Sequence, residues 1–304
     1  MKILILGYSK IVRKRVLNVL KKKKFKIFVA SKTFKEKIPG VNKQYKSYEV
    51  AIKNCKPNLI YISLPNSKHY FWAKKSLIAK CNTVVDKPIT CTKKQLDNLI
   101  NLSKRKKKLL AEATYYNYHS QIRKIKNIYK RDKFKFINAK FIIPTPDKKS
   151  ILLSKKLKGG ALMDMGPYIS SIPRIFELKT IINKNVKVKK NNNNLIIFLK
   201  FQINYKEGKY NGIFQFGGKY RNEILIKNQY KNYMIKRAFS PPDNENLFLY
   251  NIKNNKNKKS IKFRKQNCFK NFFNEVIKNI KLKKYDFYYP RMKQDCYFRY
   301  DLIK

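Results

Sequence analysis

The first 113 residues alternate short apolar runs with longer segments of helical character, and this alternation constrains the fold more than any other feature. The run from Ile3 to Leu6 is continuously apolar, as strands buried on both faces of a parallel sheet are. Further strands are expected at 27–30, 59–64, 83–85 and 109–113, and helices at 11–24, 67–79 (with Asn66 as N-cap) and 92–106. Strands that alternate with helices predict βαβ units and a Rossmann-type, doubly wound parallel sheet.

The pattern changes after residue 120. Strands are expected at 134–143, 195–203, 210–216, 223–226 and 233–237, and few helices interrupt them, which favours a mainly antiparallel open sheet. Helices are expected from near Gly160, at 268–280 and at about 290–303, and the polar segment 187–194 is a loop or a strand edge. We therefore predict an α/β protein with a Rossmann domain at 1–120 and an α/β domain at 121–304. The last helices are expected to pack back towards the first domain.

Several classes of protein are disfavoured by composition. There is no run of 18 apolar residues, so no membrane span is expected. The five cysteines lack any CxxC pair and are odd in number, which argues against a disulfide framework and a zinc site. With only two histidines, metal catalysis is not expected either. These features predict a cytoplasmic protein without a metal.

The net charge of +56 raises the alternative of a nucleic-acid-binding protein. However, 62 of the 73 basic residues are Lys and only 11 are Arg, and the lysines are spread along the whole chain. Arginine is the residue that grips phosphates bidentately and reads base edges. Lys, Asn, Ile, Tyr and Phe are enriched together, as A- and T-rich codons would produce. We interpret the charge as compositional background and expect no specific nucleic-acid partner.

The turn after the first strand is a candidate phosphate loop. Its residues run Gly7-Tyr8-Ser9-Lys10-Ile11-Val12. A dinucleotide fingerprint uses glycines here because the backbone must turn tightly and approach the pyrophosphate at a helix N-terminus. Gly7 keeps the first of these glycines, and Ser9, which is small and can donate to phosphate, replaces the second. Gly7, Ser9, Lys10 and Ile11 are therefore candidate cofactor contacts, with an ordinary strand-to-helix turn as the alternative.

The end of the second strand bears on which dinucleotide would bind. An acidic residue there binds the ribose 2′-hydroxyl of NAD, whereas a basic residue accommodates the 2′-phosphate of NADP. The chain has Ser31 and Lys32 at this position and no acid before Glu36. This favours NADP over NAD, unless Lys32 is only one more surface lysine.

Three further segments, taken in order, resemble a known family. They are Ile62-Ser63-Leu64-Pro65-Asn66-Ser67-Lys68-His69, Val84-Val85-Asp86-Lys87-Pro88 and the glycine-rich run from Gly159 to Tyr168. Their order and spacing resemble the glucose–fructose oxidoreductase, inositol dehydrogenase and MocA (Gfo/Idh/MocA) family of NAD(P)-dependent oxidoreductases. The likeness extends to 111–113, to the segment Arg237-Ala238-Phe239-Ser240-Pro241-Pro242 and to the helix expected at 268–280.

The resemblance implies a sugar-like substrate and roles for particular residues. Lys87 matches the lysine that lies beside the nicotinamide and the reacting hydroxyl, and Asp86 matches the acid before it. Asp164 and Tyr168 match an acid and a proton-transferring residue that lie one helical turn apart, on one face. The implied function is hydride transfer between nicotinamide and a secondary alcohol or ketone of a sugar, nucleotide sugar or polyol. A homo-oligomer formed through the open sheet is also implied.

Other predicted contacts follow from the same likeness. Leu64, Pro65, Asn66, His69 and Asp86 are expected near the cofactor, and His119 near the substrate. Each has a plainer alternative: Lys87 as a surface lysine, Asp164 and Tyr168 as a helix-start acid and a core aromatic, His69 as a structural histidine. The altered phosphate loop leaves a second function open, a non-catalytic family member that binds or scaffolds a partner.

Overall fold

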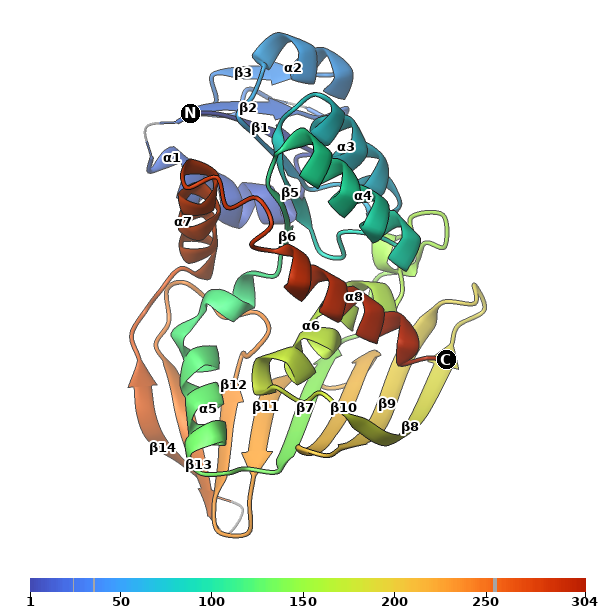
Figure 1. The fold of residues 1–304 in the computed structure, drawn as a ribbon, viewed down its shortest axis with the longest axis vertical. Helices are drawn as coiled ribbons and strands as arrows, with labels where there is room; N and C mark the ends of the chain where they lie inside the picture. The colour runs from blue at the N-terminus through green and yellow to red at the C-terminus, as the bar shows by residue number, and fades with distance from the viewer. Residues whose placement is uncertain (24, 35, 254–255) are drawn as a thin grey trace. The chain divides into compact units, whose positions relative to one another are not determined.

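The computed structural model describes residues 1–23, 25–34, 36–253 and 256–304. The chain forms two compact units. The amino-terminal unit contains Met1–Ala113 and Phe269–Lys293, and the carboxy-terminal unit contains Thr114–Cys268 and Gln294–Lys304. Helix α8, Tyr289–Asp301, therefore begins in the first unit and ends in the second (Figure 1). The predicted division into 1–120 and 121–304 remains a prediction about which segments act as domains.

The sheet of the amino-terminal unit has the order β3-β2-β1-β4-β5-β6, and its paired strands are all parallel. The strands are β1 Lys2–Leu6, β2 Lys26–Ala30, β3 Lys43–Tyr45, β4 Leu59–Ile62, β5 Asn82–Asp86 and β6 Leu110–Ala113. The doubly wound sheet predicted from the sequence is confirmed. The strand order reverses between β1 and β4, and ligands bind open α/β sheets at the carboxyl ends of the strands beside such a point.

The helices of this unit differ from the expected ones in three places. The first helix is π-helical over η1 Val12–Val16 before it continues as α1 Leu17–Lys21. Asn66 is the first residue of α3, Asn66–Ile78, and Pro65 is its N-cap, so the expected capping role of Asn66 is wrong. Helix α2, Tyr48–Cys55, was not predicted. Helix α4, Lys93–Lys106, agrees with the sequence pattern, and its N-cap Thr92 accepts a hydrogen bond from the Gln95 amide.

The carboxy-terminal unit has a sheet of order β14-β13-β12-β11-β7-β10-β9-β8, in which β10 and β7 are parallel and the other pairs antiparallel. The strands are β7 Phe136–Ile143, β8 Ile181–Lys190, β9 Ile196–Tyr205, β10 Gly208–Phe216, β11 Arg221–Lys227, β12 Asn232–Lys236, β13 Leu247–Lys253 and β14 Lys256–Phe263. The mainly antiparallel sheet is confirmed. Part of the segment 187–194 lies in the edge strand β8, and β13 and β14 were not predicted.

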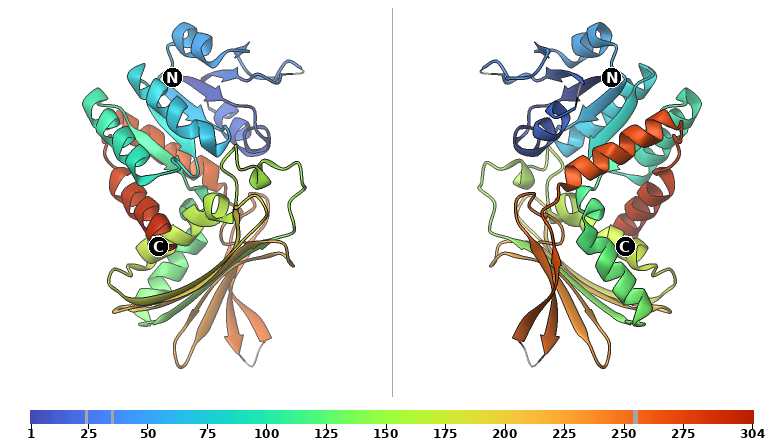
Figure 2. Two further views of the ribbon diagram at one scale, coloured as in Figure 1. Left: turned by 90° about the vertical axis from the view of Figure 1, so that its right-hand side faces the viewer. Right: turned by 90° about the vertical axis from the view of Figure 1, so that its left-hand side faces the viewer.

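Helices α5, Ser120–Arg131, and α6, Ala161–Phe176, cover one face of this sheet (Figure 2). In the two further views, no helix among the described residues of this unit lies on the opposite face (Figure 2). Burial alternates along β7, β10 and β11, as it must when one face packs on helices and the other does not. The inward side chains and the apolar sides of α5 and α6 make the core.

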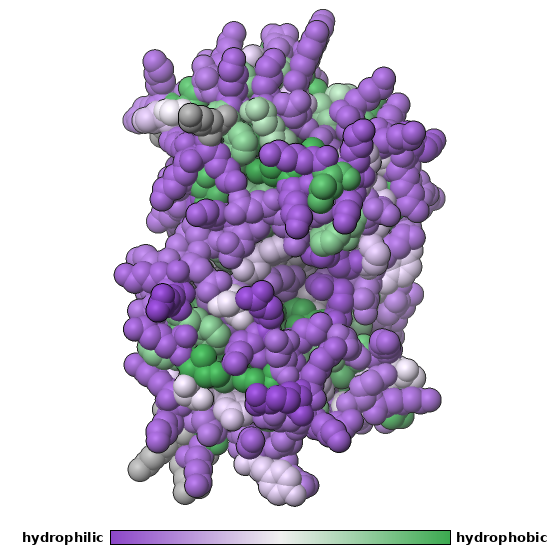
Figure 3. All heavy atoms as spheres, turned by 60° about the vertical axis from the view of Figure 1, so that its left-hand side comes forward, coloured by the Kyte–Doolittle hydropathy of each residue, from purple (hydrophilic) through white to green (hydrophobic). Residues whose placement is uncertain are grey.

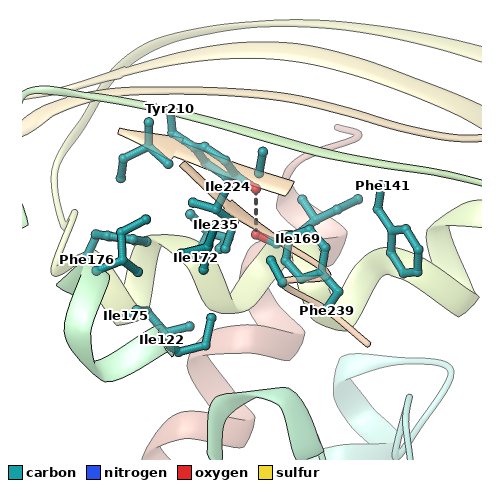
Figure 4. Packing of buried hydrophobic residues seen from close by; sticks show 14 of the residues in the cluster. Ile122, Phe141, Ile169, Ile172, Ile175, Phe176, Tyr210, Ile224, Ile235 and Phe239 are labelled. Carbon is teal, nitrogen blue, oxygen red and sulfur yellow. Dashed lines mark hydrogen bonds between the residues drawn. The ribbon is translucent and has the colours of Figure 1, made fainter. Parts of the chain in front are cut away.

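Aromatic and β-branched side chains from distant segments fill that core (Figure 4). Ile169 and Ile172 of α6 are fully buried against the strands. The Tyr210 hydroxyl of β10 donates to the Ile169 carbonyl at 3.2 Å, so this buried polar group is satisfied. Burying each such side chain contributes roughly 1.5–3 kcal/mol, which holds α6 on the sheet.

The surface carries the excess charge. Figure 3 shows hydrophilic side chains over most of one face, with small apolar areas between them. Among the residues that the structure describes, no helix has the length and apolar character needed to cross a membrane. No cluster of three or more potential metal ligands occurs within the same described ranges.

Candidate active site

The turn after β1 brings the candidate phosphate loop against the end of β4. Gly7 has φ 97°, and its amide donates to the Ala30 carbonyl at 2.8 Å. A Cβ at this position would collide with the Ser63 carbonyl oxygen. Gly7 is therefore required both by its torsion and by the close approach of two strand ends. The tight turn predicted from the sequence is present.

Ser9 joins this loop to the neighbouring strands by a chain of hydrogen bonds. Its hydroxyl lies 2.7 Å from the Ser63 hydroxyl and accepts from the Val12 amide at 3.3 Å. Ser63 in turn donates to the Asp86 carboxylate at 2.5 Å, and Tyr61 donates to the other oxygen at 2.5 Å. The serine that replaces a family glycine thus caps the first helix and links β1, β4 and β5. Ser63 and Tyr61 were not predicted as site residues, although both stand in the predicted strand 59–64.

Asp86 is the acid before the candidate catalytic lysine. Burial raises its pKa, and the hydrogen bonds from Ser63 and Tyr61, together with the charges of His69 and Lys87, lower it in part. These partners favour the carboxylate that burial opposes. Asp86 therefore helps to hold the end of β5, directly before Lys87, which is half-buried. The Lys87–Pro88 peptide bond is cis.

His69 lies inside the unit and holds two turns together. Its Nδ1 is 2.7 Å from the Pro88 carbonyl and its Nε2 is 2.7 Å from the Leu64 carbonyl. Burial lowers the pKa of His69, whereas the two carbonyls and Asp86 favour the protonated ring. A neutral imidazole has one N–H and can donate to only one of these oxygens. The structure thus places His69 between the backbones that follow β4 and β5.

The end of β2 presents the residues expected near a ribose. Ser31 is buried, and its hydroxyl accepts from the Thr33 amide at 3.3 Å, whereas Lys32 is exposed. In the helix that follows β1, the Arg13 guanidinium lies 5.6 Å from the centre of the Tyr8 ring, a cation–π contact. Arg13 was not predicted as a site residue, because it was counted with the general basic charge, although it follows closely after Gly7 in the sequence.

Lys10 and Ile11 begin the helix that follows the loop, with Lys10 exposed and Ile11 half-buried. Leu64, Pro65 and Asn66, all half-buried, form the turn between β4 and α3. The structure therefore brings the predicted cofactor residues together at the carboxyl ends of β1, β2, β4 and β5, all within one unit.

The carboxy-terminal unit holds Asp164 and Tyr168, one turn apart on α6 and both half-buried. The Tyr168 ring is surrounded by aromatic rings: its centre lies 5.5 Å from that of Tyr116, 5.4 Å from Phe141 and 5.4 Å from Phe239. Three such neighbours restrict the ring to one orientation. Tyr168 is thus a positioned phenol, as proton transfer requires.

Beneath Tyr168, the carboxy-terminal unit is held by buried polar pairs. The Tyr116 and Ser171 hydroxyls form a hydrogen bond, and burial raises the pKa of Tyr116 well above its usual value. Arg174 donates bidentately to Asp295 of α8, both bonds at 2.8 Å. A Cβ at Gly166 would collide with the buried Arg299 side chain, which explains one glycine of the cluster. These contacts anchor α6 on both of its sides.

His119 is buried at 2% exposure and caps α5. Its Nδ1 accepts from the Gln121 amide at 3.2 Å, and its ring meets Phe263 edge-on at 6.3 Å. Burial lowers its pKa to about 4. The structure places it in the interior, in a capping position, and its expected contact with substrate stays a prediction.

A protein-family model matches the amino-terminal domain. Residues 1–114 match the model of the GFO_IDH_MocA family, described as an oxidoreductase family with an NAD-binding Rossmann fold. The amino-terminal domain is that of the Gfo/Idh/MocA oxidoreductases. The family likeness of the motifs around Gly7, Pro65 and Lys87 is thereby confirmed.

Curated relatives match over part of the chain. An uncharacterised oxidoreductase of Rhizobium meliloti is 29% identical over 132 residues, covering 42% of this chain and 40% of the relative. A dTDP-3,4-didehydro-2,6-dideoxy-alpha-D-glucose 3-reductase of Saccharopolyspora spinosa is 28% identical over 134 residues, covering 43% and 40%. The aligned region thus spans about 40% of the length of these relatives.

Solved oxidoreductase structures resemble nearly the whole chain. A 3-ketoreductase from Actinomadura kijaniata, solved with NADP and TDP-benzene, has a TM-score of 0.87 at 16% identity and covers 97% of this chain and 94% of its own. An aldose–aldose oxidoreductase from Caulobacter crescentus, solved with glycerol, has a TM-score of 0.83 at 14% identity, covering 100% and 96%. At these identities the likeness establishes the shared fold.

Proposed function

We propose that this Gfo/Idh/MocA protein is an NADP-dependent oxidoreductase that interconverts a secondary alcohol and a ketone on a sugar-like substrate. The observation that carries the proposal is the arrangement of Gly7, Ser9, Ser63, Asp86 and Lys87, called the cradle below. Gly7 allows two strand ends to approach closely, and hydrogen bonds link Ser9 through Ser63 to Asp86, which directly precedes Lys87. The aromatic setting of Tyr168 supplies a second, independent support. The reductase and dehydrogenase relatives agree with this chemistry.

The residues of the cradle fit a dinucleotide. The first amide groups of the helix that starts at Lys10, with the Ser9 hydroxyl in the preceding loop, would hold a pyrophosphate. Lys32 follows β2, and Arg13 lies in η1, the helix after β1; both are cations that a ribose 2′-phosphate could use. Because no acid stands at the end of β2, NADP is the preferred cofactor and NAD the alternative.

The proposed mechanism uses three side chains. Bound NADPH would supply the hydride that reduces the substrate carbonyl. Tyr168 donates its phenolic proton to the oxygen on which negative charge develops, and the Lys87 ammonium stabilises that charge. Asp164 orients the substrate hydroxyls from the same face of α6 as Tyr168. In the oxidative direction the same groups act in reverse.

The test combines equilibrium binding with turnover. Purified protein should enhance the fluorescence of NADPH. It should also oxidise NADPH when a suitable substrate from a panel of ketosugars and nucleotide ketosugars is added. Lys87→Ala and Tyr168→Phe should each reduce kcat by roughly 10²-fold to 10⁴-fold, the usual contribution of a positioned acid–base group. Their Kd for NADPH should change little.

Several results would contradict this proposal. Normal turnover by either variant would remove that residue from the mechanism. Protein that binds neither NADPH nor NADH would favour the non-catalytic family member instead.

Two further parts of the proposal concern the molecule's setting. The outward face of the large sheet carries half-buried apolar side chains, among them Phe136, Ile142, Ile213 and Leu225, which suit self-association. We expect a homo-oligomer through this face, to be measured by sedimentation. All five cysteines carry free thiols, which suits the reducing cytoplasm.

A further inference from the structure

We propose that Arg237, together with Tyr220, Ser240 and Asn222, forms a subsite for an anionic group of the substrate, adjoining Tyr168. The four residues are called the Arg237 cluster below. This inference rests on the proposed function, because it names the class of substrate for the same site. The class is a sugar that carries phosphoryl oxygens, as a nucleotide sugar does.

The cluster is organised by the buried amide of Asn222, at the start of β11. Its Oδ1 accepts from the Phe239 amide at 2.8 Å. Its Nδ2 donates to the Ser240 hydroxyl at 2.7 Å and to the Tyr220 hydroxyl at 3.0 Å. The amide fixes both hydroxyl oxygens and accepts no proton from them. The two hydroxyls also lie 3.4 Å apart, so one of them donates to the other and the second keeps its O–H for another acceptor.

Arg237 adds a positioned cation to these hydroxyls. Its side chain donates to the Tyr220 hydroxyl at 3.1 Å, and its guanidinium lies 5.5 Å from the centre of the Tyr220 ring. The residue is exposed, and within the described ranges no carboxylate forms an ion pair with it. The bond to Tyr220 uses one of the five guanidinium N–H groups, and the other four are not needed for it.

The backbone of Arg237 is unusual and is held in place. Its φ is 54°, a left-handed conformation that is uncommon for a residue with a side chain. The Gln121 side chain of α5 donates to its carbonyl at 3.3 Å. Such conformations cluster at ligand sites, where the surroundings maintain them.

The cluster lies on the same face of the sheet as Tyr168. Asn222 is paired in register with Phe141 of β7, and the Phe141 ring lies 5.4 Å from the Tyr168 ring. Phe239, which follows Arg237 by two residues, also contacts Tyr168 at 5.4 Å and stacks on Phe141 at 5.5 Å. Figure 4 shows Phe141 and Phe239 together beside α6. One substrate could therefore reach both Tyr168 and the cluster.

The chemistry of the cluster selects its ligand. A planar guanidinium pairs with phosphate or carboxylate oxygens through two parallel bonds, and hydroxyl donors add to them. The many exposed lysines lack this fixed fork. Because Arg237 is one of only 11 arginines and its hydroxyl neighbours are prearranged, we distinguish it from the general positive charge. A sugar carboxylate would also offer two oxygens to the guanidinium. The experiment below therefore distinguishes phosphoryl from carboxylate ligands.

The test is equilibrium titration of the full-length protein, both without NADPH and with NADPH in excess. Thymidine diphosphate, glucose 1-phosphate and glucuronate are titrated separately into wild-type protein and into Arg237→Gln, Tyr220→Phe and Lys219→Gln. Lys219→Gln is the matched control, since it removes one neighbouring exposed charge. We expect Arg237→Gln to weaken thymidine diphosphate binding by roughly 10-fold to 100-fold, as loss of a charge-assisted contact does. Tyr220→Phe should weaken it by about 3-fold to 10-fold, and Lys219→Gln by less than about 2-fold.

The outcomes are separable. Equal weakening by Arg237→Gln and Lys219→Gln, or no binding of thymidine diphosphate by folded wild-type protein, would overturn the subsite. Binding of glucuronate but neither phosphate would also overturn the phosphoryl assignment. If Arg237→Gln fails to fold, Tyr220→Phe alone decides. Failure of the proposed function shows instead as absent NADPH binding or turnover, which these titrations do not measure.

Discussion

Single residues set the tightest local requirements, and Gly7 is the clearest case. We expect Gly7→Ala to lower the free energy of unfolding by roughly 2–5 kcal/mol, because a left-handed torsion and a backbone collision add together. Gly40→Ala is the control, since Gly40 also has positive φ but a Cβ there would meet only the flexible Lys21 side chain. That variant should lose roughly 1–2 kcal/mol. Urea unfolding measures both, and equal losses would contradict the collision.

His119 makes stability depend on pH. Its pKa is lowered to about 4 by burial, against about 6.5 in an unfolded chain. Between these values the unfolded chain binds a proton that the folded chain does not, so the free energy of unfolding falls as pH drops through this window. The contribution lost at pH 5 is about 2 kcal/mol.

The measurement is urea unfolding at pH 7 and pH 5, for wild-type protein and for His119→Gln, which keeps an acceptor for the Gln121 amide. The variant should lose less stability on acidification than wild type. An identical pH response in both proteins would show that this histidine does not titrate as described.

At the scale of elements, α7, Cys268–Lys281, shows how a distant segment completes a unit. Its Phe273 is fully buried and meets the Tyr61 ring of β4 edge-on at 5.7 Å. Phe273→Ala should cost about 3–5 kcal/mol in the free energy of unfolding, as deletion of a core aromatic does. Phe287→Ala, at a 38% exposed side chain, should cost less than about 1 kcal/mol. Similar effects of the two changes on thermal unfolding would mean that α7 packs loosely.

Elements differed in how far the sequence predicts them. The buried strands of the amino-terminal sheet are continuous apolar runs, so they were located within a few residues. Helix α5 was missed although Ile122, Ile125 and Ile128 follow a helical spacing and are buried. Edge strand β8 has almost no sequence signal, because its Lys- and Asn-rich side chains stay exposed and only pairing with β9 makes it a strand.

At the scale of the whole molecule, the charge of +56 governs non-specific association. We expect DNA binding with a Kd of roughly 10⁻⁴ to 10⁻⁶ M that weakens steeply with added salt and is independent of sequence. A charge spread along the chain predicts that no single Lys→Gln change alters the Kd more than about 3-fold. Fluorescence anisotropy over a salt series measures this. Tight binding to one sequence at physiological salt would instead support a nucleic-acid function.

Residues of the candidate site were predicted only where they belong to a recognisable sequence motif. Gly7, Lys87, Asp164 and Tyr168 stand in segments whose spacing and residue types carry a recognisable chemistry. Ser63, Arg237 and Ser240 stand in segments that carry the family likeness, but no role was predicted for them. Tyr61, Tyr220 and Asn222 were not predicted either, because their partners lie on other segments of the chain. The position of His69 between two carbonyls also depends on the turns that follow β4 and β5.

The amino-acid sequence by itself determined the alternation of strands and helices, the tight turn at Gly7 and the family to which the amino-terminal domain belongs. Local periodicity and torsional preference suffice for the first two, since they depend on neighbouring residues, whereas the family was inferred from the likeness of several motifs. Only the tertiary structure decided that Ser9 reaches Asp86 through Ser63, and that Asn222 aligns Tyr220 and Ser240 beside Arg237. Such contacts join residues that are distant in the sequence. They depend on strand register and on packing, and no short segment of the chain determines either of these.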